Sequence, residues 1–376
     1  MKTKKTTYAL FLTLSACCCG VCSSDKDTPD EVKEEPAIDW SAAANRSSRA
    51  LISSFWDAQE HYFWDNSYGN KSFGYWPQAH ALDVLVDAYE RSKSSYYEPY
   101  FGWWFDGVWK KNGNQWYNHF FDDMEWIALA LLRTYKATGD EKYKDATLEL
   151  WGYIREGWND SADGGIAWER VDHIWSKNAC SNGPASILAA RLYQETGEET
   201  YKEWALKIYE WEKNTLFNGS TGAVYDNING LSGEKNTSWI FTYNQGTFIG
   251  AAVELHKITG KKAYLDDAAL AAKYTMTVLV TDAILKDEGS GDGGLFKGIF
   301  VRYFTELIRQ EQLSSDVRKS YVQFLQHNAE TLWTEGANST PVLFGTNWSR
   351  SPGARTGLAE QISGCMLIEA MNRIEN

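Results

Sequence analysis

Two adjacent aspartates, Asp122 and Asp123, stand directly before a strongly apolar segment at 125–136. Their neighbours Phe121 and Met124 are large and apolar. Burial among apolar groups and the closeness of a like charge both raise the pKa of a carboxyl group, which keeps a general acid protonated near neutral pH. The pair also has a plain structural interpretation, because an aspartate can cap a helix and favours its positive end.

The chemistry that suits such a pair is glycoside hydrolysis, which uses two carboxyl groups beside the scissile bond. In the retaining mechanism they lie roughly 5–5.5 Å apart, one as nucleophile and one as acid/base. Adjacent residues reach that separation if the backbone turns between them. The pair alone leaves a catalytic centre and a helix cap both open.

Other polar motifs precede apolar segments in the same way. Tyr243-Asn244-Gln245-Gly246 combines amides that suit sugar hydroxyls with an aromatic face, although an asparagine cap followed by a closely packed glycine explains it equally. The segments 76–78, 177–184 and 292–303 are further sets of this kind, and the first contains Trp76. The chain has 18 Trp, and tryptophan faces are common platforms for sugar rings, although a large helical core also uses them.

A repeat indicates which elements position these motifs. Gly139, Gly197 and Gly260 each follow a threonine and precede a tyrosine by four residues, and they are 58 and 63 residues apart. A glycine in the left-handed conformation ends many helices, so each repeat predicts a helical hairpin. Six such units would fill the chain, and apolar residues recur at helical spacing through most of it. We therefore expect an all-α (α/α)6 toroid of six helical hairpins as one domain at 40–376, with loops gathered over a central groove.

The N-terminus predicts export. Residues 1–16 combine lysines, a short apolar stretch and a small-residue cleavage site, which is typical of a signal peptide. Leu-Ser-Ala before Cys17 resembles a bacterial lipobox, so Cys17 is the expected lipidation site, although an ordinary secretory signal is the alternative. Residues 17–39 are polar and charged and read as a flexible tether. We expect a secreted lipoprotein of the bacterial outer membrane, on the cell surface or the periplasmic face.

Composition limits the partners. The formal net charge of −13 disfavours nucleic-acid binding. Cys180 and Cys365 are the only cysteines in the predicted domain, and the sequence leaves open whether they form a disulfide. No spacing of cysteine and histidine suggests a zinc site, and we expect no metal. Hydrolysis by two carboxyl groups requires no organic cofactor. We also expect the protein to be a monomer.

The motifs together resemble glycoside hydrolase family 76, the bacterial and fungal α-1,6-mannanases. The resemblance runs from about Trp40 to the end of the chain and rests on Phe-Asp-Asp-Met-Glu-Trp at 121–126, Lys-Asn-Ala-Cys-Ser-Asn-Gly-Pro at 177–184, Thr-Tyr-Asn-Gln-Gly-Thr-Phe-Ile-Gly-Ala at 242–251 and Gly-Leu-Phe-Lys-Gly-Ile-Phe at 294–300. It implies an (α/α)6 fold and retaining, endo-acting cleavage of α-1,6-linked mannan backbones.

The resemblance also implies roles for single residues. Asp122 matches the nucleophile and Asp123 matches the acid/base. The expected substrate-binding residues are Tyr243, Asn244, Gln245, Trp126, Trp168, Arg302 and Trp76, of which Trp126, Trp168 and Arg302 are offered on residue type and setting.

Two other functions remain open on the sequence. One is another helical-toroid carbohydrate enzyme, such as a sugar epimerase with paired histidines or an unsaturated-uronyl hydrolase. The six histidines show no such pairing with the motifs: His61, His80, His119, His173, His256 and His327. The other is a non-catalytic surface lipoprotein that binds mannan or another glycan, which needs no carboxylate pair.

Overall fold

The computed structural model describes residues 37–375, and the chain from Ile38 onward forms one compact unit. The expected signal peptide, Cys17 and the tether up to residue 36 lie outside the described residues. Within the described part, no helix is both long enough and apolar enough to cross a bilayer.

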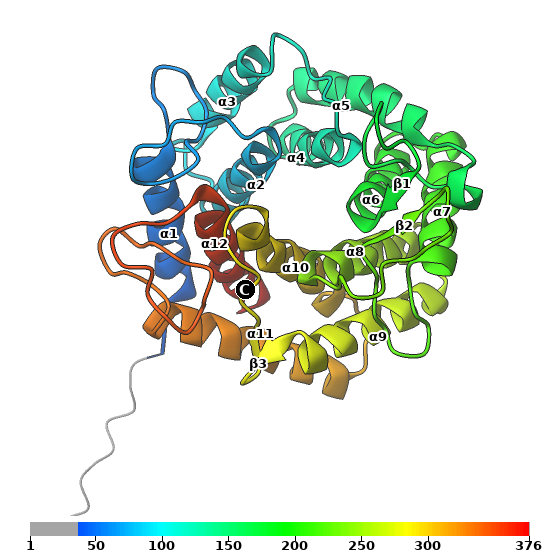
Figure 1. Ribbon diagram of the computed structural model, residues 1–376. Coiled ribbons are helices and arrows are strands. Elements are labelled where there is room, and N and C mark those ends of the chain that lie inside the picture. The colour runs from blue at the N-terminus through cyan, green and yellow to red at the C-terminus, as the bar shows by residue number, and fades with distance from the viewer. Residues whose placement is uncertain (1–36, 376) are drawn as a thin grey trace, which may run out of the picture. The chain divides into compact units, whose positions relative to one another are not determined.

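Twelve α-helices of the described chain form two concentric rings, which Figure 1 shows in face view. The inner ring consists of α2 (Tyr75–Ser92), α4 (Phe121–Thr138), α6 (Ala179–Thr196), α8 (Thr242–Thr259), α10 (Asp292–Ile308) and α12 (Leu358–Glu375). The outer ring consists of α1 (Trp40–Phe55), α3 (Glu98–Lys111), α5 (Glu141–Ile154), α7 (Glu199–Thr215), α9 (Lys262–Val278) and α11 (Ser315–Thr334). Each inner helix packs on the next, and α12 returns to α2 and also packs on α1. The (α/α)6 prediction is confirmed.

Burial separates the two rings. The inner helix α8 is buried without a break from Thr242 to His256, whereas the outer helix α7 buries one stripe that includes Ile208 and Tyr209. A helix that is apolar on all sides belongs inside a protein, and an amphipathic helix covers it. The sequence therefore specifies which ring each helix joins.

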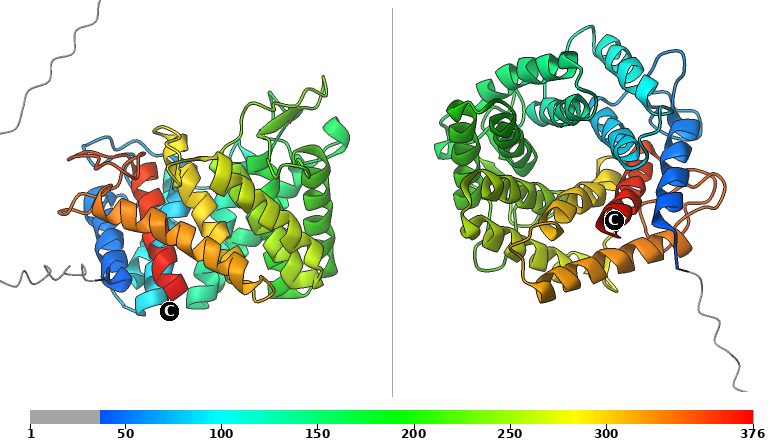
Figure 2. Two further views of the ribbon diagram at one scale, coloured as in Figure 1. Left: turned by 90° about the horizontal axis from the view of Figure 1, so that it is seen from below. Right: turned by 180° about the vertical axis from the view of Figure 1, so that it is seen from behind.

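The glycine repeat closes three of the hairpins as predicted. Gly139, Gly197 and Gly260 end α4, α6 and α8 with φ of 74°, 74° and 70°. A side chain at these positions would meet no atom within 4 Å, so the left-handed backbone rather than lack of space requires glycine. Because each outer helix returns the chain, all six inner helices run in the same direction. Their N-termini and the long connections gather at one end of the ring, as Figure 2 shows in its left view.

Four inner helices bind the loop at this end through a side-chain amide, a contact that we call the amide clamp. The amide is the fourth residue of its helix, accepts from one backbone N–H and donates to a backbone carbonyl, at 2.8–3.1 Å. The amides and the loop residues that they hold are Gln78 with Phe63, Asn182 with Ile166, Gln245 with Val224, and Gln361 with Phe344 and Val342. Since a buried backbone group without a partner costs about 1–3 kcal/mol, the clamps fix the loops that cover the groove.

Short strands and turns complete these connections. Strand β1 (Ser176–Asn178) pairs antiparallel with β2 (Asn227–Asn229), which ties the loop before α6 to the loop before α8. The strands β3 (Val280–Thr281) and β4 (Ile284–Leu285) form a second hairpin. The two 3-10 turns are η1 (Arg155–Gly157) and η2 (Ser161–Asp163).

Candidate active site

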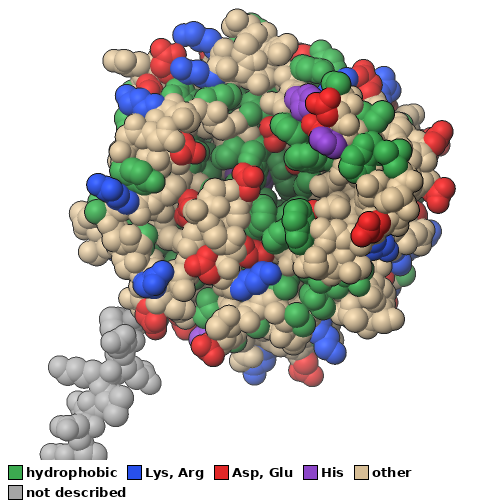
Figure 3. All heavy atoms as spheres, viewed as in Figure 1, with side chains coloured by type: hydrophobic (Ala, Val, Ile, Leu, Met, Phe, Trp, Pro, Cys, Tyr) green, Lys and Arg blue, Asp and Glu red, His purple; other side chains and the backbone are tan. Residues whose placement is uncertain are grey.

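The N-termini of α2, α4, α6, α8 and α10 open onto a groove of about 1050 Å³. Its aromatic lining consists of Trp76, Phe120, Trp126, Trp168, Trp175, Trp239, Phe241, Tyr243 and Phe296. Its acidic lining includes Asp122, Asp123, Asp226 and Asp292. Figure 3 shows this face, with apolar side chains around a central hollow and acidic side chains among them. Flat aromatic faces and carboxylates are the groups that a carbohydrate cleft needs.

The structure decides against the simple helix-cap interpretation of the aspartate pair. The N-cap of α4 is Phe120, which makes no side-chain capping bond, and the two aspartates are the second and third residues of the helix. Asp122 and Asp123 are half-buried and both border the groove. Their position in the first turn places both charges at the positive end of α4.

The surroundings give the two carboxyl groups different proton affinities. Burial raises the pKa of Asp122 to about 6, against the opposing effect of the Cys180 thiol and nearby backbone amides. Burial also raises the pKa of Asp123 well above its usual range, and the charges of Asp122 and Asp292 raise it further. The two groups titrate as a coupled pair, which holds one proton over the intermediate pH range. The charges of Asp122 and Asp292, which raise the pKa of Asp123 further, favour Asp123 as the group that holds this proton, and one ionised and one protonated carboxyl group is what a nucleophile and a general acid require.

A further carboxyl group lies behind the pair. Glu125 is fully buried. Burial, followed by the charges of Asp122 and Glu212, raises the pKa of Glu125 well above its usual range. The raised pKa favours the uncharged form of Glu125, so this side chain adds no second negative charge next to Asp122.

Two aromatic side chains of the groove are held by carboxylates. The Tyr243 hydroxyl donates to Asp226 Oδ1 at 2.6 Å, and its ring lies 4.4 Å from that of Phe296. Trp76 Nε1 donates to Asp292 Oδ1 at 3.1 Å. Each bond fixes the orientation of a ring that faces the groove.

The structure brings most of the predicted site residues together. Asp122 and Asp123 share the groove with four predicted aromatic residues, which are Trp76, Trp126, Trp168 and Tyr243. The expectations for Asn244 and Gln245 need correction, because both side chains are fully buried. The Asn244 amide points to the Val224 carbonyl at 3.4 Å, and Gln245 is an amide clamp on the same residue. These amides hold the loop that carries Asp226 rather than line the groove.

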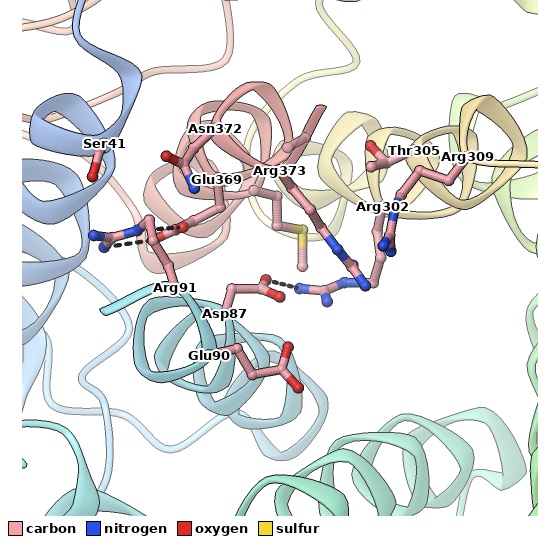
Figure 4. Close-up of a pocket in the computed structure, with 12 residues that line it drawn as sticks. Ser41, Asp87, Glu90, Arg91, Arg302, Thr305, Arg309, Glu369, Asn372 and Arg373 are labelled. Atoms are coloured by element: carbon pink, nitrogen blue, oxygen red, sulfur yellow. Dashed lines mark hydrogen bonds and ion pairs between the residues drawn. The ribbon is translucent and has the colours of Figure 1, made fainter. Parts of the chain in front are cut away.

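The expectation for Arg302 is also corrected. Arg302 lies ten residues beyond Asp292 along α10, which carries it roughly 15 Å towards the other end of the ring. It lines a separate pocket of about 550 Å³ there, and its guanidinium pairs with Asp87 at 3.3 Å and Asp83 at 3.6 Å. Figure 4 shows this pocket, where the Arg302 and Asp87 side chains face each other between α10 and α2.

Arg302→Met is therefore expected to destabilise the fold without weakening substrate binding. The expected cost is about 1.5–3 kcal/mol, the usual contribution of a hydrogen bond to a charged group, because Arg133 still pairs with Asp83 at 2.8 Å and with Asp87 at 2.6 Å. Thermal and urea unfolding measure the loss, and KM for the substrate should stay unchanged. The matched control is Arg309→Met, an exposed arginine of the same pocket, with an expected change within about 0.5 kcal/mol. A large rise in KM with unchanged stability would contradict this placement.

Several groove residues were not predicted. Asp226 and Trp175 lie in connections for which the sequence gives no signal of a site. Trp239 begins the polar segment 239–246 before α8, but it is not among the expected substrate-binding residues. Asp292 and Phe296 belong to the segment 292–303, one of the polar sets that the sequence shows next to an apolar stretch. The rule that the inner N-termini meet at one end would have identified Asp292, the first residue of α10.

The cysteines of the described chain are both buried free thiols. Cys180 borders the groove, while Cys365 lies in α12 with its sulfur 3.5 Å from the Ser47 carbonyl. Cys180 and Cys365 therefore form no disulfide with each other in this structure.

Comparisons with known proteins agree with this site. The model of glycosyl hydrolase family 76 matches residues 39–375. The solved structure of the GH76A α-1,6-mannanase from Salegentibacter sp. HEL1_6 is similar with a TM-score of 0.87 and 45% identity, over 89% of this chain and 100% of that chain. An inactive variant of that mannanase, with two consecutive aspartates changed to alanine, was solved in complex with α-1,6-mannotetrose, and it matches with a TM-score of 0.87 and 44% identity over 90% of this chain and 100% of that chain.

A curated relative matches over a shorter part. The mannan endo-1,6-α-mannosidase DCW1 of Saccharomyces cerevisiae is 39% identical over 112 residues, which are 27% of this chain. The matched part covers 24% of the length of the yeast protein. With the family model covering nearly the whole described domain, this glycoside hydrolase belongs to glycosyl hydrolase family 76.

Proposed function

We propose that this glycoside hydrolase is a retaining, endo-acting α-1,6-mannanase. The observation that carries the proposal is the half-buried pair Asp122 and Asp123 at the start of α4, with its two different proton affinities. A consecutive aspartate pair is also what was replaced in the inactive Salegentibacter mannanase that holds α-1,6-mannotetrose. The groove, about 1050 Å³ in volume, has room for several sugar units, which favours cleavage inside a chain.

The chemistry follows from the two proton affinities. Ionised Asp122 attacks the anomeric carbon while protonated Asp123 gives its proton to the leaving oxygen, which forms a covalent mannosyl-enzyme. Asp123, now ionised, then takes a proton from water, and that water releases the sugar from Asp122. The neutral Glu125 behind Asp122 adds no competing charge, and Tyr243 and Trp76 offer rings to the sugar faces.

Two product analyses test the proposal. Thin-layer chromatography of a digest of linear α-1,6-mannan should show a ladder of oligosaccharides early in the reaction, because endo-acting cleavage starts inside the chain. Mannose as the sole early product would contradict endo action. Proton NMR should show the α anomer first, and an initial β anomer would remove the nucleophile role of Asp122. Binding of mannan without any cleavage would favour the non-catalytic binding protein instead.

We further propose that the enzyme is a monomer that a lipid on Cys17 anchors at the bacterial outer membrane, on the cell surface or the periplasmic face. The lipobox-like Leu-Ser-Ala-Cys and the polar tether support the anchor. Cys17→Ala should move the protein from the membrane fraction to the soluble fraction and abolish labelling by a fatty-acid analogue. Labelling that persists in this variant, while Cys18→Ala removes it, would shift the anchor to the neighbouring cysteine.

A further inference from the structure

A cluster of metal-ligand side chains lies beside the catalytic groove and takes no part in the proposed reaction. His119 Nε2 lies 2.7 Å from Glu169 Oε2. The potential ligand atoms of His119, Glu169 and Asp172 all lie within 4.8 Å of one another. We propose that these three residues bind a divalent transition metal ion, for which Zn²⁺ is the best match.

The donor set has the chemistry of a zinc site. One imidazole nitrogen and two carboxylate oxygens are standard zinc ligands, at about 2.0–2.2 Å from the ion. Tetrahedral ligands then stand roughly 3.3 Å from one another. The His119–Glu169 pair at 2.7 Å therefore opens by roughly 0.6 Å, and the other pairs, which lie within 4.8 Å, close by at most about 1.5 Å. His119 and Asp172 have room for these shifts, because the His119 side chain is 41% exposed and Asp172 is exposed.

A second histidine supports the central ligand. His173 Nδ1 contacts Glu169 Oε1, the oxygen that faces away from His119. Carboxylates that bind metals are commonly held in this way by a further hydrogen bond. Glu169 is itself only 5% exposed, so the buried Glu169 is the central ligand and the more exposed His119 and Asp172 complete the set.

The position of the cluster indicates what an ion would do there. His119 and Glu169 belong to two chain segments that already pair, through Arg170 N–H to the His119 carbonyl at 3.2 Å and Phe121 N–H to the Trp168 carbonyl at 3.0 Å. The neighbours of these ligands, Phe120 and Trp168, line the groove with rings 4.9 Å apart. A bound ion would lock this wall of the groove. Because His119 and Glu169 are fifty residues apart in the sequence, the ligands form no recognisable zinc-binding motif, and the sequence alone therefore predicts no metal site.

Metal titration tests the site directly. The tag-free protein, dialysed against a chelator, is titrated with ZnCl2 by isothermal titration calorimetry, with MnCl2 and CaCl2 as comparisons. One equivalent of Zn²⁺ should bind. His119→Gln and Asp172→Asn should each weaken binding at least tenfold, and His173→Gln should weaken it by about 10–100-fold. Asp172 is exposed, so its variant keeps the fold even where the histidine variants lose stability.

Matched controls come from other exposed residues, since His327→Gln and Asp163→Asn change one histidine and one aspartate outside the cluster. Both should bind Zn²⁺ like the parent protein. In hydrolysis assays, Zn²⁺ should lower KM more than it changes kcat, and Asp172→Asn should remove this effect. The proposal is overturned if no saturable binding occurs, or if Asp172→Asn binds as tightly as the parent. These outcomes are independent of the proposed mannanase activity, because calorimetry needs no substrate.

Discussion

Asp123→Ala is expected to slow hydrolysis of α-1,6-mannan by about 10²–10⁴-fold, the usual contribution of a positioned general acid. Without Asp123 the leaving oxygen departs as an unprotonated alkoxide. With an aryl α-mannoside whose leaving group is a weak base, the loss in kcat/KM should nearly vanish, because kcat/KM reports formation of the covalent intermediate and that leaving group needs no proton. The loss in kcat should persist, because the release of the sugar by water still lacks its base. Initial rates on both substrates measure the difference.

Asp122→Ala should lose at least as much activity on mannan and gain nothing from the better leaving group, since no nucleophile remains to form the covalent intermediate. Calorimetry with α-1,6-mannotetrose should show that both variants still bind, because the aromatic lining of the groove is intact. Asp163→Asn is the control, an exposed change outside the groove. Equal behaviour of the two variants on the aryl substrate would contradict the division of roles, and full activity of either would contradict the site.

The fold could be predicted because three of the helical hairpins contain the same sequence feature, a glycine directly after the first helix. These helices end at Gly139, Gly197 and Gly260 in the left-handed conformation, which favours glycine, so the position of each helix end can be recognised in the sequence. The other helices end without such a glycine. The C-cap of α2 is Lys93, which adopts the left-handed conformation with φ of 49° although it is not glycine, whereas the C-cap of α10 is Arg309 in an ordinary right-handed helical conformation. The pairing of α1 with α12 joins the two ends of the domain, and no local pattern can reveal it.

The site was predicted only in part, because residue type does not say which partner a side chain meets. Gln245 has an amide that binds a sugar hydroxyl or a peptide group equally well. The structure shows the peptide group, through a clamp that recurs at Gln78 and Gln361. Arg302 belongs to the same helix as Asp292, but the length of α10 separates them. The pair Asp122 and Asp123 could be predicted because the apolar residues that surround it, Phe121 and Met124, are its direct neighbours in the sequence.

The same environment predicts how activity depends on pH. Activity requires ionised Asp122, so it should fall as the pH drops through about 6, the raised pKa of that group. It also requires protonated Asp123, so it should fall again as the pH rises through the higher pKa of that carboxyl. The profile of kcat/KM should be bell-shaped, with a tenfold loss per pH unit beyond each limb, and the two limbs belong to the coupled pair.

Asp292→Asn provides the strongest test of this electrostatic account. The charge of Asp292 raises the pKa of both catalytic carboxyl groups, while an asparagine oxygen still accepts the Trp76 Nε1 hydrogen bond. Removing the charge should therefore move the acid and the alkaline limbs to lower pH, so that the variant outperforms the parent enzyme on the acid side and loses activity earlier on the alkaline side. Asp163→Asn, which removes a charge outside the groove, should leave both limbs in place. Limbs that stay fixed or move to higher pH in Asp292→Asn would mean that burial alone sets the proton affinities of Asp122 and Asp123.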